Sequence, residues 1–514
     1  MGITEKINEL AKKRAELYLG GGKDRIDKQH AAGKMTARER LEALVDPETF
    51  QEFSLFAKHR CVNFGMADKE LPADGVVTGT AKVDGRQVHV ASQDFTVAGG
   101  AAGEIHCNKI VEAMKASLKT GTPFIFINDS GGARVQEGID SLGGYGRVFF
   151  NNTMLSGVVP QISLICGPCA GGAAYSPALT DFIIQTRQAQ IFITGPQVIK
   201  QVTGEEVTAD ALGGVDAQMG YSGVVHFEAE DDQHAIDICR QLLSFLPSNN
   251  LEDPPVVEGQ YDVSDNPDMN AIVPDEAKRG YDVHDVIAGV VDDGYFLEVQ
   301  ETFAKNIVVG FGRVTGRPIG IIANQPSVLA GVLDINSSDK AARFIRFCNA
   351  FNIPLVTFVD VPGFLPGVDQ EYGGIIRHGA KMLFAYSAAT VPKITVIMRK
   401  AYGGGYLAMC AKDLGADRVV AWPSAEIAVM GAEGAAEIVF RNEINKAEDK
   451  AAMRAQKIAE YREMFSNPYF AAARGMVDDV IPPSETRRYI ARALEALQTK
   501  RDMRPQKKHG LIPL

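Results

Sequence analysis

The feature that most constrains the fold of this chain is an internal repeat. Three separated blocks recur at an offset of 231 or 232 residues: GRQVHVASQD at 85–94 with GRPIGIIANQ at 316–325, PFIFIND at 123–129 with PLVTFVD at 354–360, and VPQISLICGPCAGGAAY at 159–175 with VPKITVIMRKAYGGGYL at 391–407. Blocks that keep one nearly constant offset predict two copies of a single unit of about 230 residues.

Within the first copy, short apolar runs alternate with glycine-rich turns and helical stretches. Buried strands are predicted at 88–92, 123–129 and 160–166, and helices at Glu104–Lys119, Leu142–Ser156 and Ser176–Arg187. This alternation predicts an α/β fold.

Further helices are predicted before the first strand and in the C-terminal part of the chain. Residues 3–19 have the pattern of an amphipathic helix ended by three glycines. Thr36 and Glu39 have the spacing of a capping box, which predicts a charged helix near 36–45. A charged helical tail is expected over 446–500.

A polar stretch separates the two copies. Residues 247–275 are rich in Pro, Asn and Asp and lack apolar periodicity, which is typical of a linker. We therefore predict an N-terminal domain over 1–255 and a C-terminal domain over 270–514.

Charge and cysteine content limit the function classes. The net charge of −11 gives no general electrostatic reason to bind nucleic acid or anionic membranes. Seven cysteines, an odd number in a long chain, favour a reducing compartment over a disulfide framework. The N-terminus lacks the apolar core of a signal peptide, and no apolar run reaches the ~18 residues of a membrane span. A cytoplasmic location is expected.

Each copy carries two glycine-rich turns directly after a predicted buried strand. They are DSGGAR at 129–134 and GPCAGGAAYS at 167–176, then DVPGFLPG at 360–367 and RKAYGGGYLA at 399–408. Glycine lets the backbone turn sharply and approach a ligand. Two such turns facing one another would offer paired N–H donors to a developing oxyanion. The plainer alternative is an ordinary tight turn at the end of each parallel strand.

Other motifs argue against competing chemistries. Cys166-Gly-Pro-Cys169 spells a thioredoxin-type sequence, but it runs into Ala-Gly-Gly within a much longer chain, so buried structural cysteines are the favoured interpretation. The sequence contains no P-loop and no G-x-S-x-G. Its histidines lack zinc-type spacing, so no metal site is predicted.

Long strings along the chain show a family resemblance: KQHAAGKMTARERL (28–41), PADGVVTG (72–79), SQDFTVAGG (92–100), NDSGGARVQEG (128–138), GPCAGGAAYSPALTDF (167–182), ANQPSVLAG (323–331), FVDVPGFLPG (358–367), GGIIRHGAKML (373–383) and RKAYGGGYLAM (399–409). The chain resembles the carboxyltransferase subunits of biotin-dependent acyl-CoA enzymes. That family includes propionyl-CoA carboxylase β subunits, methylmalonyl-CoA carboxyltransferase and the α subunit of methylmalonyl-CoA decarboxylase. The resemblance implies two tandem crotonase-like units, each a ββα spiral of the ClpP/crotonase type.

The resemblance also implies an assembly. Such subunits form homohexamers, two stacked trimers, in which the N-terminal unit of one chain faces the C-terminal unit of another. Acyl-CoA would lie on the N-terminal unit, and biotin would enter from the C-terminal side. Because the sequence has no Met-Lys-Met attachment signal, biotin is expected on a partner protein or subunit. A biotin carboxylase and a membrane decarboxylase subunit are further candidate partners.

The expected chemistry assigns residues to two pockets. Carboxyl transfer at the α-carbon of an acyl-CoA passes through a thioester enolate, and we assign the backbone N–H groups of Ala133 and Gly172 to its oxygen. The N–H groups of Gly404 and Gly405 are assigned to the ureido oxygen of biotin. No side-chain general base is evident, and the family suggests that a biotin nitrogen takes the α-proton.

Further contacts are expected around these turns. Substrate-binding residues are predicted to be Gly131, Gly132, Arg134, Gly171, Ala173, Tyr175, Tyr406 and Leu407. Arg134 would either pair with a CoA phosphate or hold its own loop. The candidates for other phosphate contacts are Lys28, Arg38 and Arg40, for which the alternative is an ordinary exposed helix charge. His378 is expected to pack near the second site.

One departure from the family pattern bears on the substrate. Many propionyl-CoA and acetyl-CoA carboxylase β subunits carry Asp after the Tyr of the second glycine turn, whereas this chain has Leu407. The string GGGYLAMC is closer to the carboxyltransferase and decarboxylase branch of the family. Gly405 stands where Ala or Ser is usual. We therefore expect methylmalonyl-CoA and propionyl-CoA as the substrate pair. An ATP-dependent carboxylase β subunit is the alternative.

Two other function classes remain open on the sequence. A crotonase-type hydratase or isomerase would need an acid such as Glu137 or Asp140 over the oxyanion pocket. A non-catalytic scaffold would have no need for intact glycine turns.

Overall fold

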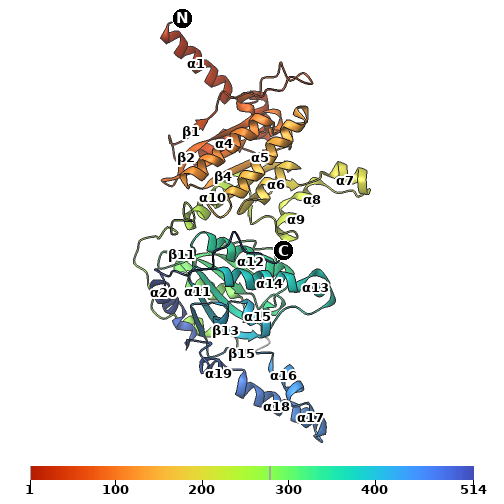
Figure 1. Cartoon of the computed structure of the whole chain (residues 1–514), viewed down its shortest axis with the longest axis vertical. Coiled ribbons are helices and arrows are strands. Elements are labelled where there is room, and N and C mark those ends of the chain that lie inside the picture. The colour runs from red at the N-terminus through yellow and green to blue at the C-terminus, as the bar shows by residue number, and fades with distance from the viewer. Residues whose placement is uncertain (1, 277–278) are drawn as a thin grey trace. The chain divides into compact units, whose positions relative to one another are not determined.

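The computed structural model describes residues 2–276 and 279–514. The chain divides into two compact units, Met1–Glu252 and Asp253–Leu514 (Figure 1). The boundary falls inside the segment 247–275, most of which has neither helix nor strand. Each unit is described separately below.

The first unit is built on one sheet. Its strands are β1 (Gln51–Phe53), β2 (Val76–Val83), β3 (Arg86–Gln93), β4 (Phe124–Ser130), β5 (Gln161–Ala170), β6 (Phe182–Thr186), β7 (Gln190–Phe192) and β8 (Phe227–Ala229). The order is β1-β2-β3-β4-β5-β6-β8, with β7 beside β5. The two ladders at the β1 end are antiparallel, and all later ladders are parallel.

The second unit has a matching sheet. Its strands are β9 (Leu297–Glu298), β10 (Ile307–Val314), β11 (Arg317–Asn324), β12 (Leu355–Val361), β13 (Lys393–Tyr402), β14 (Arg418–Ala421), β15 (Glu426–Ala428) and β16 (Asp479–Val480). The order is β9-β10-β11-β12-β13-β14-β16, with β15 beside β13.

The two sheets agree down to their register. Phe124 pairs with Gln161 in the first unit, and Leu355 pairs with Lys393 in the second, which are the positions that the repeat offset relates. Both central ladders shift register at the same place, before Ser130 and before Val361. The predicted α/β fold and its tandem duplication are confirmed.

Helices cover the sheets. The first unit has α1 (Ile3–Tyr18), α2 (Lys23–Ala31), α3 (Ala37–Leu44), α4 (Glu104–Thr120), α5 (Ile139–Leu155), α6 (Gly172–Ala178), α7 (Pro196–Thr203), α8 (Ala209–Gly213), α9 (Val215–Gly220) and α10 (Asp232–Phe245). The second has α11 (Val283–Val290), α12 (Ile335–Ala350), α13 (Val368–Gly373), α14 (Ile375–Ala388), α15 (Gly403–Ala408), α16 (Ala432–Val439), α17 (Arg441–Lys446), α18 (Lys450–Phe465), α19 (Pro468–Ala472) and α20 (Thr486–Ala496). In corresponding places, α4 packs on α5 and α12 packs on α14.

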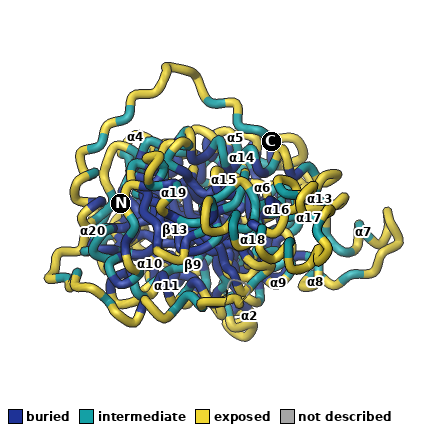
Figure 2. Tube along the Cα trace, turned by 90° about the horizontal axis from the view of Figure 1, so that it is seen from below, coloured by how far each residue is buried: buried dark blue, intermediate teal, exposed yellow. Residues whose placement is uncertain are grey.

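Each unit has its own apolar core. Every residue of β4 and of β12 is buried, because helices or other chain cover both faces of these central strands. Figure 2 shows buried chain in dark blue, for example at β13. Phe124 and Met114 belong to the first core, and Phe358 and Trp422 to the second. The indole N–H of Trp422 donates to Thr486 Oγ1 at 3.0 Å, which ties α20 to the sheet.

The predicted helix over Ser176–Arg187 is wrong. Helix α6 begins earlier, at Gly172, and ends at Ala178. The run from Phe182 to Thr186 forms strand β6, all of whose residues are buried. Its apolar, β-branched residues pair with β5, and this tertiary pairing outweighs a helical reading of the local sequence.

Helices α1 and α3 differ in how far they bury their apolar side chains. Helix α3 has the predicted capping box between Thr36 and Glu39, and it buries Leu41 and Leu44. Helix α1 has no buried residue, so it forms without burying its apolar side chains within its unit.

A charged cluster in the second unit predicts a pH effect on stability. His284 Nδ1 lies 2.6 Å from Asp282 Oδ1, and His284 Nε2 lies 2.7 Å from Glu298 Oε2. The hydrogen bond to Glu298, with help from Asp282, raises the pKa of His284 from 6.5 to about 9. Protonated His284 therefore stabilises the fold fully below about pH 6.5, and that contribution is lost as the pH rises through about 9.

We expect the difference in thermal unfolding midpoint between the wild-type protein and His284→Gln to shrink over that window. Scanning calorimetry from about pH 6 to about pH 10 measures it. A difference that stays constant with pH would contradict this assignment.

Among the described residues, no helix combines the length and the apolar character needed to cross a bilayer.

Candidate functional site

The first pair of glycine turns meets at the ends of β4 and β5. Ser130 pairs with Cys169 in the last step of this parallel ladder, so the chain leaves both strands at the same edge of the sheet. A Cβ on Gly132 would lie 2.9 Å from the carbonyl oxygen of Ala170, which places the first turn against the second. Gly132 has φ +98°, a conformation that favours glycine.

The N–H of Ala133 faces away from the neighbouring segment at Ala102. Ala102 N–H donates to Gly132 O at 2.9 Å, and Arg134 N–H donates to Ala102 O at 2.9 Å. In this parallel bridge the groups of Ala133 itself point to the opposite side. No hydrogen bond from its N–H is found within the described part of the chain.

Gly172 carries the second N–H group assigned from the sequence to the first unit. Gly171, with φ +59°, turns the chain after β5, and its N–H donates to Phe192 O at 3.1 Å. Gly172 then opens α6, so its own N–H has no acceptor inside the helix. The Tyr145 ring lies 3.2 Å from the place that a Cβ on Gly172 would occupy.

The second unit repeats this geometry. Leu333 N–H donates to Gly363 O at 3.0 Å, and Leu365 N–H donates to Leu333 O at 2.7 Å. These bonds form a parallel bridge between Leu333 and Phe364. Phe364 therefore holds the place that Ala133 holds in the first unit.

The predicted residues Gly404 and Gly405 lie in the first turn of α15, where N–H groups have no acceptor inside the helix. Gly404 is exposed. A Cβ on Gly405 would lie 3.0 Å from Gly363 Cα, so this turn also abuts its neighbour.

Sequence reasoning missed Phe364. A backbone N–H donor carries no side-chain signature, and no glycine marks this position. The repeat offset was a sufficient signal, because adding 231 to Ala133 gives Phe364.

Arg134 holds its own loop. Its guanidinium is buried and contacts Asp74 Oδ1 at 2.6 Å and Glu137 Oε1 at 2.8 Å. It also donates to Ala101 O at 2.9 Å. With these partners Arg134 fits the loop-holding alternative rather than a phosphate contact.

The predicted phosphate ligands differ in environment. Arg40 is fully buried and pairs with Asp129 and Asp232, so the interpretation of it as a phosphate ligand or an exposed charge is wrong. Arg38 is engaged by Glu52 at 2.8 Å and 3.1 Å. Lys28 is exposed on α2 and stays a candidate.

The other predicted contact residues line the turns to different degrees. Tyr175 and Leu407 are exposed at equivalent places on α6 and α15. Ala173 and Tyr406 are buried. The Tyr406 hydroxyl has no hydrogen-bond partner in the described structure, and burial raises its pKa to about 12.

Two competing chemistries find no support in the geometry. Cys166 and Cys169 are both buried free thiols, and burial raises the pKa of each well above the ordinary value. That environment suppresses the thiolate which redox exchange needs. Glu137, one of the two candidate acids of a hydratase, accepts from Arg134 with one oxygen and from Glu104 N–H with the other. The other candidate, Asp140, is exposed on α5.

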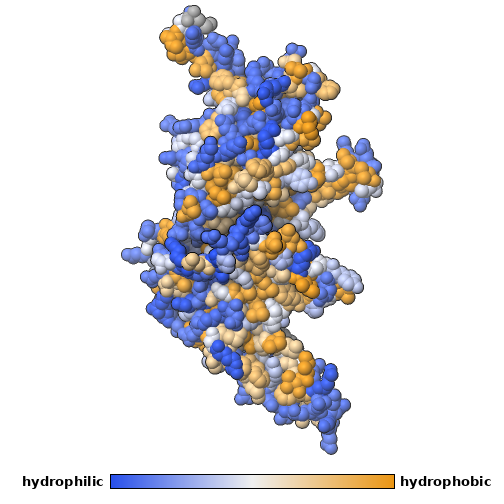
Figure 3. All heavy atoms as spheres, in the orientation of Figure 1, coloured by the Kyte–Doolittle hydropathy of each residue, from blue (hydrophilic) through white to orange (hydrophobic). Residues whose placement is uncertain are grey.

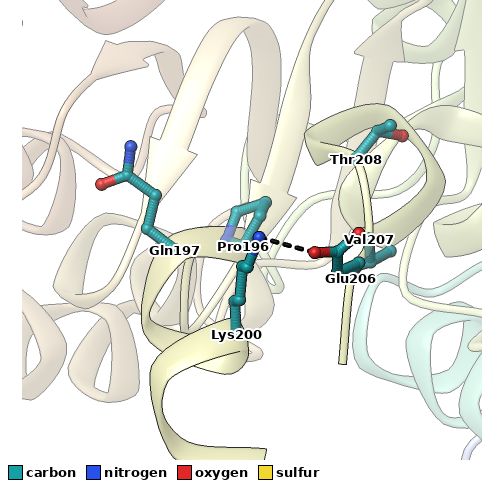
Figure 4. Close-up of a pocket in the computed structure, with 6 residues that line it drawn as sticks. All are labelled: Pro196, Gln197, Lys200, Glu206, Val207 and Thr208. Carbon is teal, nitrogen blue, oxygen red and sulfur yellow. Dashed lines mark ion pairs between the residues drawn. The ribbon is translucent and has the colours of Figure 1, made fainter. Parts of the chain in front are cut away.

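An open hollow lies beside α7. It is lined by Pro196, Gln197, Lys200, Glu206, Val207 and Thr208 (Figure 4). Lys200 Nζ lies 2.6 Å from Glu206 Oε1 across it. None of the glycine-turn residues lines this hollow.

Comparisons with known proteins agree with the geometry. The family model described as the carboxyl transferase domain matches residues 28–512. The methylmalonyl-CoA carboxyltransferase 12S subunit of Propionibacterium freudenreichii subsp. shermanii is 64% identical over 508 residues, which are 99% of this chain and 97% of that protein. The methylmalonyl-CoA decarboxylase subunit alpha of Veillonella parvula is 59% identical over 514 residues, 100% of this chain and 99% of that protein.

A solved structure is similar over the whole chain. The crystal structure of transcarboxylase 12S, described with methylmalonyl-coenzyme A and methylmalonic acid bound and as a hexamer assembly, superimposes with a TM-score of 0.99 at 63% identity. The match covers 100% of this chain and 99% of that one. The chain therefore belongs to the carboxyl transferase family, and it is an acyl-CoA carboxyltransferase subunit with two crotonase-like units.

Proposed function

We propose that this subunit moves a carboxyl group between biotin and the α-carbon of an acyl-CoA, with propionyl-CoA and methylmalonyl-CoA as the substrate pair. The observation that carries the proposal is a repeated arrangement of the main chain: Ala133 and Phe364 form equivalent bridges, and Gly172 and Gly404 lie in the first turns of equivalent helices, in two matching sheets. In our assignment the first unit holds the acyl-CoA and the second holds the biotin ring.

In the first unit, the N–H groups of Ala133 and Gly172 donate to the thioester oxygen. That oxygen becomes anionic when the α-carbon loses its proton or its carboxyl group, so both directions need the same donors. The bridge to Ala102 holds Ala133 before the substrate arrives. Donors that are already oriented stabilise the developing charge without reorganisation.

In the second unit, the N–H groups of Gly404 and Gly405 would hold the ureido oxygen of biotin. The fit rests on three features of this edge: Gly404 is exposed, Gly405 abuts Gly363, and a Cβ on Gly363 would meet no atom within 4 Å. By its equivalence to Ala133, Phe364 adds a third candidate donor. Bound biotin supplies the carboxyl carrier and a nitrogen able to take the α-proton.

The choice of substrate rests on the second glycine turn. Leu407 is 41% exposed on α15 and brings no charge to the edge where many carboxylase β subunits have Asp. Two relatives at 64% and 59% identity are named for methylmalonyl-CoA. The alternative is an ATP-dependent carboxylase, because the propionyl-CoA carboxylase carboxyltransferase subunit of Haloferax mediterranei is 57% identical over 518 residues, 100% of each chain.

Exposed apolar side chains support assembly into a homohexamer. Val202 on α7 and Ile438 on α16 are more than 60% exposed, and Figure 3 shows hydrophobic surface at both helices. Ile139 on α5 and Ile376 on α14 lie near the two glycine edges and are equally exposed. Apolar patches of this kind mark contact surfaces. We propose that copies of this chain cover them.

We further propose that a separate biotinylated protein carries biotin to this assembly in the cytoplasm. A biotin carboxylase or a membrane decarboxylase subunit would be a further partner.

The test is carboxyl transfer by the purified protein. Incubated with methylmalonyl-CoA and free biotin, it should form propionyl-CoA and carboxybiotin in equal amounts, measured by mass spectrometry. Omitting biotin should abolish product formation, and an enoyl-CoA should not be hydrated. A folded hexamer that converts enoyl-CoA but transfers no carboxyl group would overturn the proposal in favour of a hydratase.

A further inference from the structure

A buried carboxylate precedes the first turn of each site. Asp129 is the second-last residue of β4, and Asp360 is the second-last residue of β12. Both are fully buried. Their backbone N–H groups donate to equivalent side chains, Gln93 Oε1 at 3.3 Å and Asn324 Oδ1 at 3.2 Å. A buried carboxylate needs a cation and hydrogen-bond donors to remain ionised.

The second unit supplies these donors from the neighbouring strand. Arg399 Nε on β13 lies 2.9 Å from Asp360 Oδ2, and the backbone N–H of Lys400 donates to Oδ1 at 3.1 Å. Arg399 is itself held, because its Nη1 donates to Arg279 O at 2.8 Å. Both carboxylate oxygens of Asp360 are therefore satisfied within the sheet.

The first unit has neither of these donors at the equivalent positions. The residues equivalent to Arg399 and Lys400 are Gly167 and Pro168, which offer no cation and, at proline, no N–H. Asp129 Oδ1 accordingly has no hydrogen-bond partner in the described structure. A Cβ on Gly167 would lie 2.0 Å from Asp129 Oδ1 and 2.5 Å from Lys34 Nζ, so the absent side chain leaves room for another cation.

That cation comes from the segment before the sheet. Lys34, in the loop between α2 and α3, places Nζ 2.7 Å from Asp129 Oδ2. Arg40 on α3 reaches the same oxygen at 2.9 Å, and Gln29 Nε2 donates to it at 3.1 Å. Three side chains from residues 29–40 thus replace the two donors that β13 supplies in the second unit.

Of the two cations, Lys34 is tied more specifically to the turn. Arg40 also binds Asp232 Oδ2 at 2.8 Å and Cys166 O at 3.1 Å, so it holds several elements together. The Lys34 side chain is 10% exposed, and its ammonium group lies 4.8 Å from the centre of the Phe95 ring.

We propose that Lys34 is a positioning residue for the thioester pocket. Through Asp129 it sets the path of the chain from Ser130 to Ala133, and so the direction of the Ala133 N–H. The second pocket has the same device in Arg399 and Asp360, built from its own strand. This inference rests on the assignment of Ala133 to the thioester oxygen made above.

The test compares an enolate mimic with a neutral substrate. The mimic is a CoA conjugate in which a nitronate anion replaces the thioester enolate, and the neutral ligand is propionyl-CoA. Calorimetric titration of the full-length protein should show that Lys34→Met weakens nitronate binding by about tenfold, since slightly misplaced donors lose much of their effect. Propionyl-CoA binding should change by less than about threefold, because the neutral oxygen gains little from the donors.

Conservative and matched variants separate positioning from folding. Lys34→Arg keeps the cation and should restore the preference for the nitronate, whereas Asp129→Asn should reproduce the loss. Lys115→Met, at an exposed lysine on α4, should leave both affinities unchanged. Equal weakening of both ligands by Lys34→Met would mean that Lys34 serves only stability.

The preference of the wild-type protein separates failure of the positioning role from failure of the pocket assignment. If it prefers the nitronate and Lys34→Met keeps that preference, the positioning role is overturned while the thioester pocket stands. If the wild-type protein shows no preference, the pocket itself is wrongly assigned and the inference falls with it.

Discussion

Replacing Gly172 with Pro is expected to lower kcat for carboxyl transfer by about 10²–10³-fold, the usual cost of one oxyanion donor. Proline removes the N–H of Gly172. It suits the first position of a helix, where no intrahelical bond is lost, and Gly172 is the first residue of α6. The fold should therefore survive a change that removes a single donor.

Gly172→Ala is the matched control. Its Cβ meets the Tyr145 ring at the same 3.2 Å as that of proline, but the N–H remains. Transfer from methylmalonyl-CoA to biotin should be measured for both variants, with circular dichroism and thermal unfolding as checks on the fold. Similar activity in the two variants would show that the N–H of Gly172 has no part in catalysis.

Replacing Arg40 with Met is expected to lower the free energy of unfolding by about 3–5 kcal/mol, the range found when one partner of a buried ion pair is removed. Arg40 is fully buried and touches Asp129 Oδ2, Asp232 Oδ2 and Cys166 O. Methionine fills part of the space but leaves Asp232 without a cation. Asp129 keeps Lys34 as its cation and Gln29 as a neutral donor.

Urea denaturation of Arg40→Met, compared with Arg187→Met, measures this effect. Arg187 pairs with Glu228 and Glu230 at the surface, where water screens the charges, so its replacement should have a far smaller effect. If the two variants unfolded at the same urea concentration, the buried cluster would not be a main source of stability for the first unit.

The fold was largely predictable because the repeat acts on the whole chain at once. A constant offset between apolar strands requires equivalent residues to occupy equivalent places, and the two sheets accordingly share order and register. The segment after α6 was the exception. An apolar run such as Phe182–Thr186 suits a helix or a strand, and only the open edge of β5 decides between them.

Candidate site residues could be proposed from the sequence mainly where glycine-rich turns mark them. Gly172, Gly404 and Gly405 could be proposed because glycine-rich turns mark them, whereas Phe364 offers the same kind of backbone donor behind an ordinary side chain. The environments of basic residues were harder still to predict from the sequence. Arg38 and Arg40 are neighbours in one short helix, but one is paired at the rim with Glu52 and the other is fully buried.

The sequence alone determined that two α/β units are joined in tandem and that glycine turns follow their central strands, because periodicity and repetition are properties of the chain itself. Only the tertiary structure decided which backbone N–H groups remain unpaired, and that Asp129 takes its cations from Lys34 and Arg40 while Asp360 takes its own from β13. The physical reason is that a buried carboxylate accepts any cation that reaches it. The spatial path of the chain, and not the distance along the sequence, sets which one does.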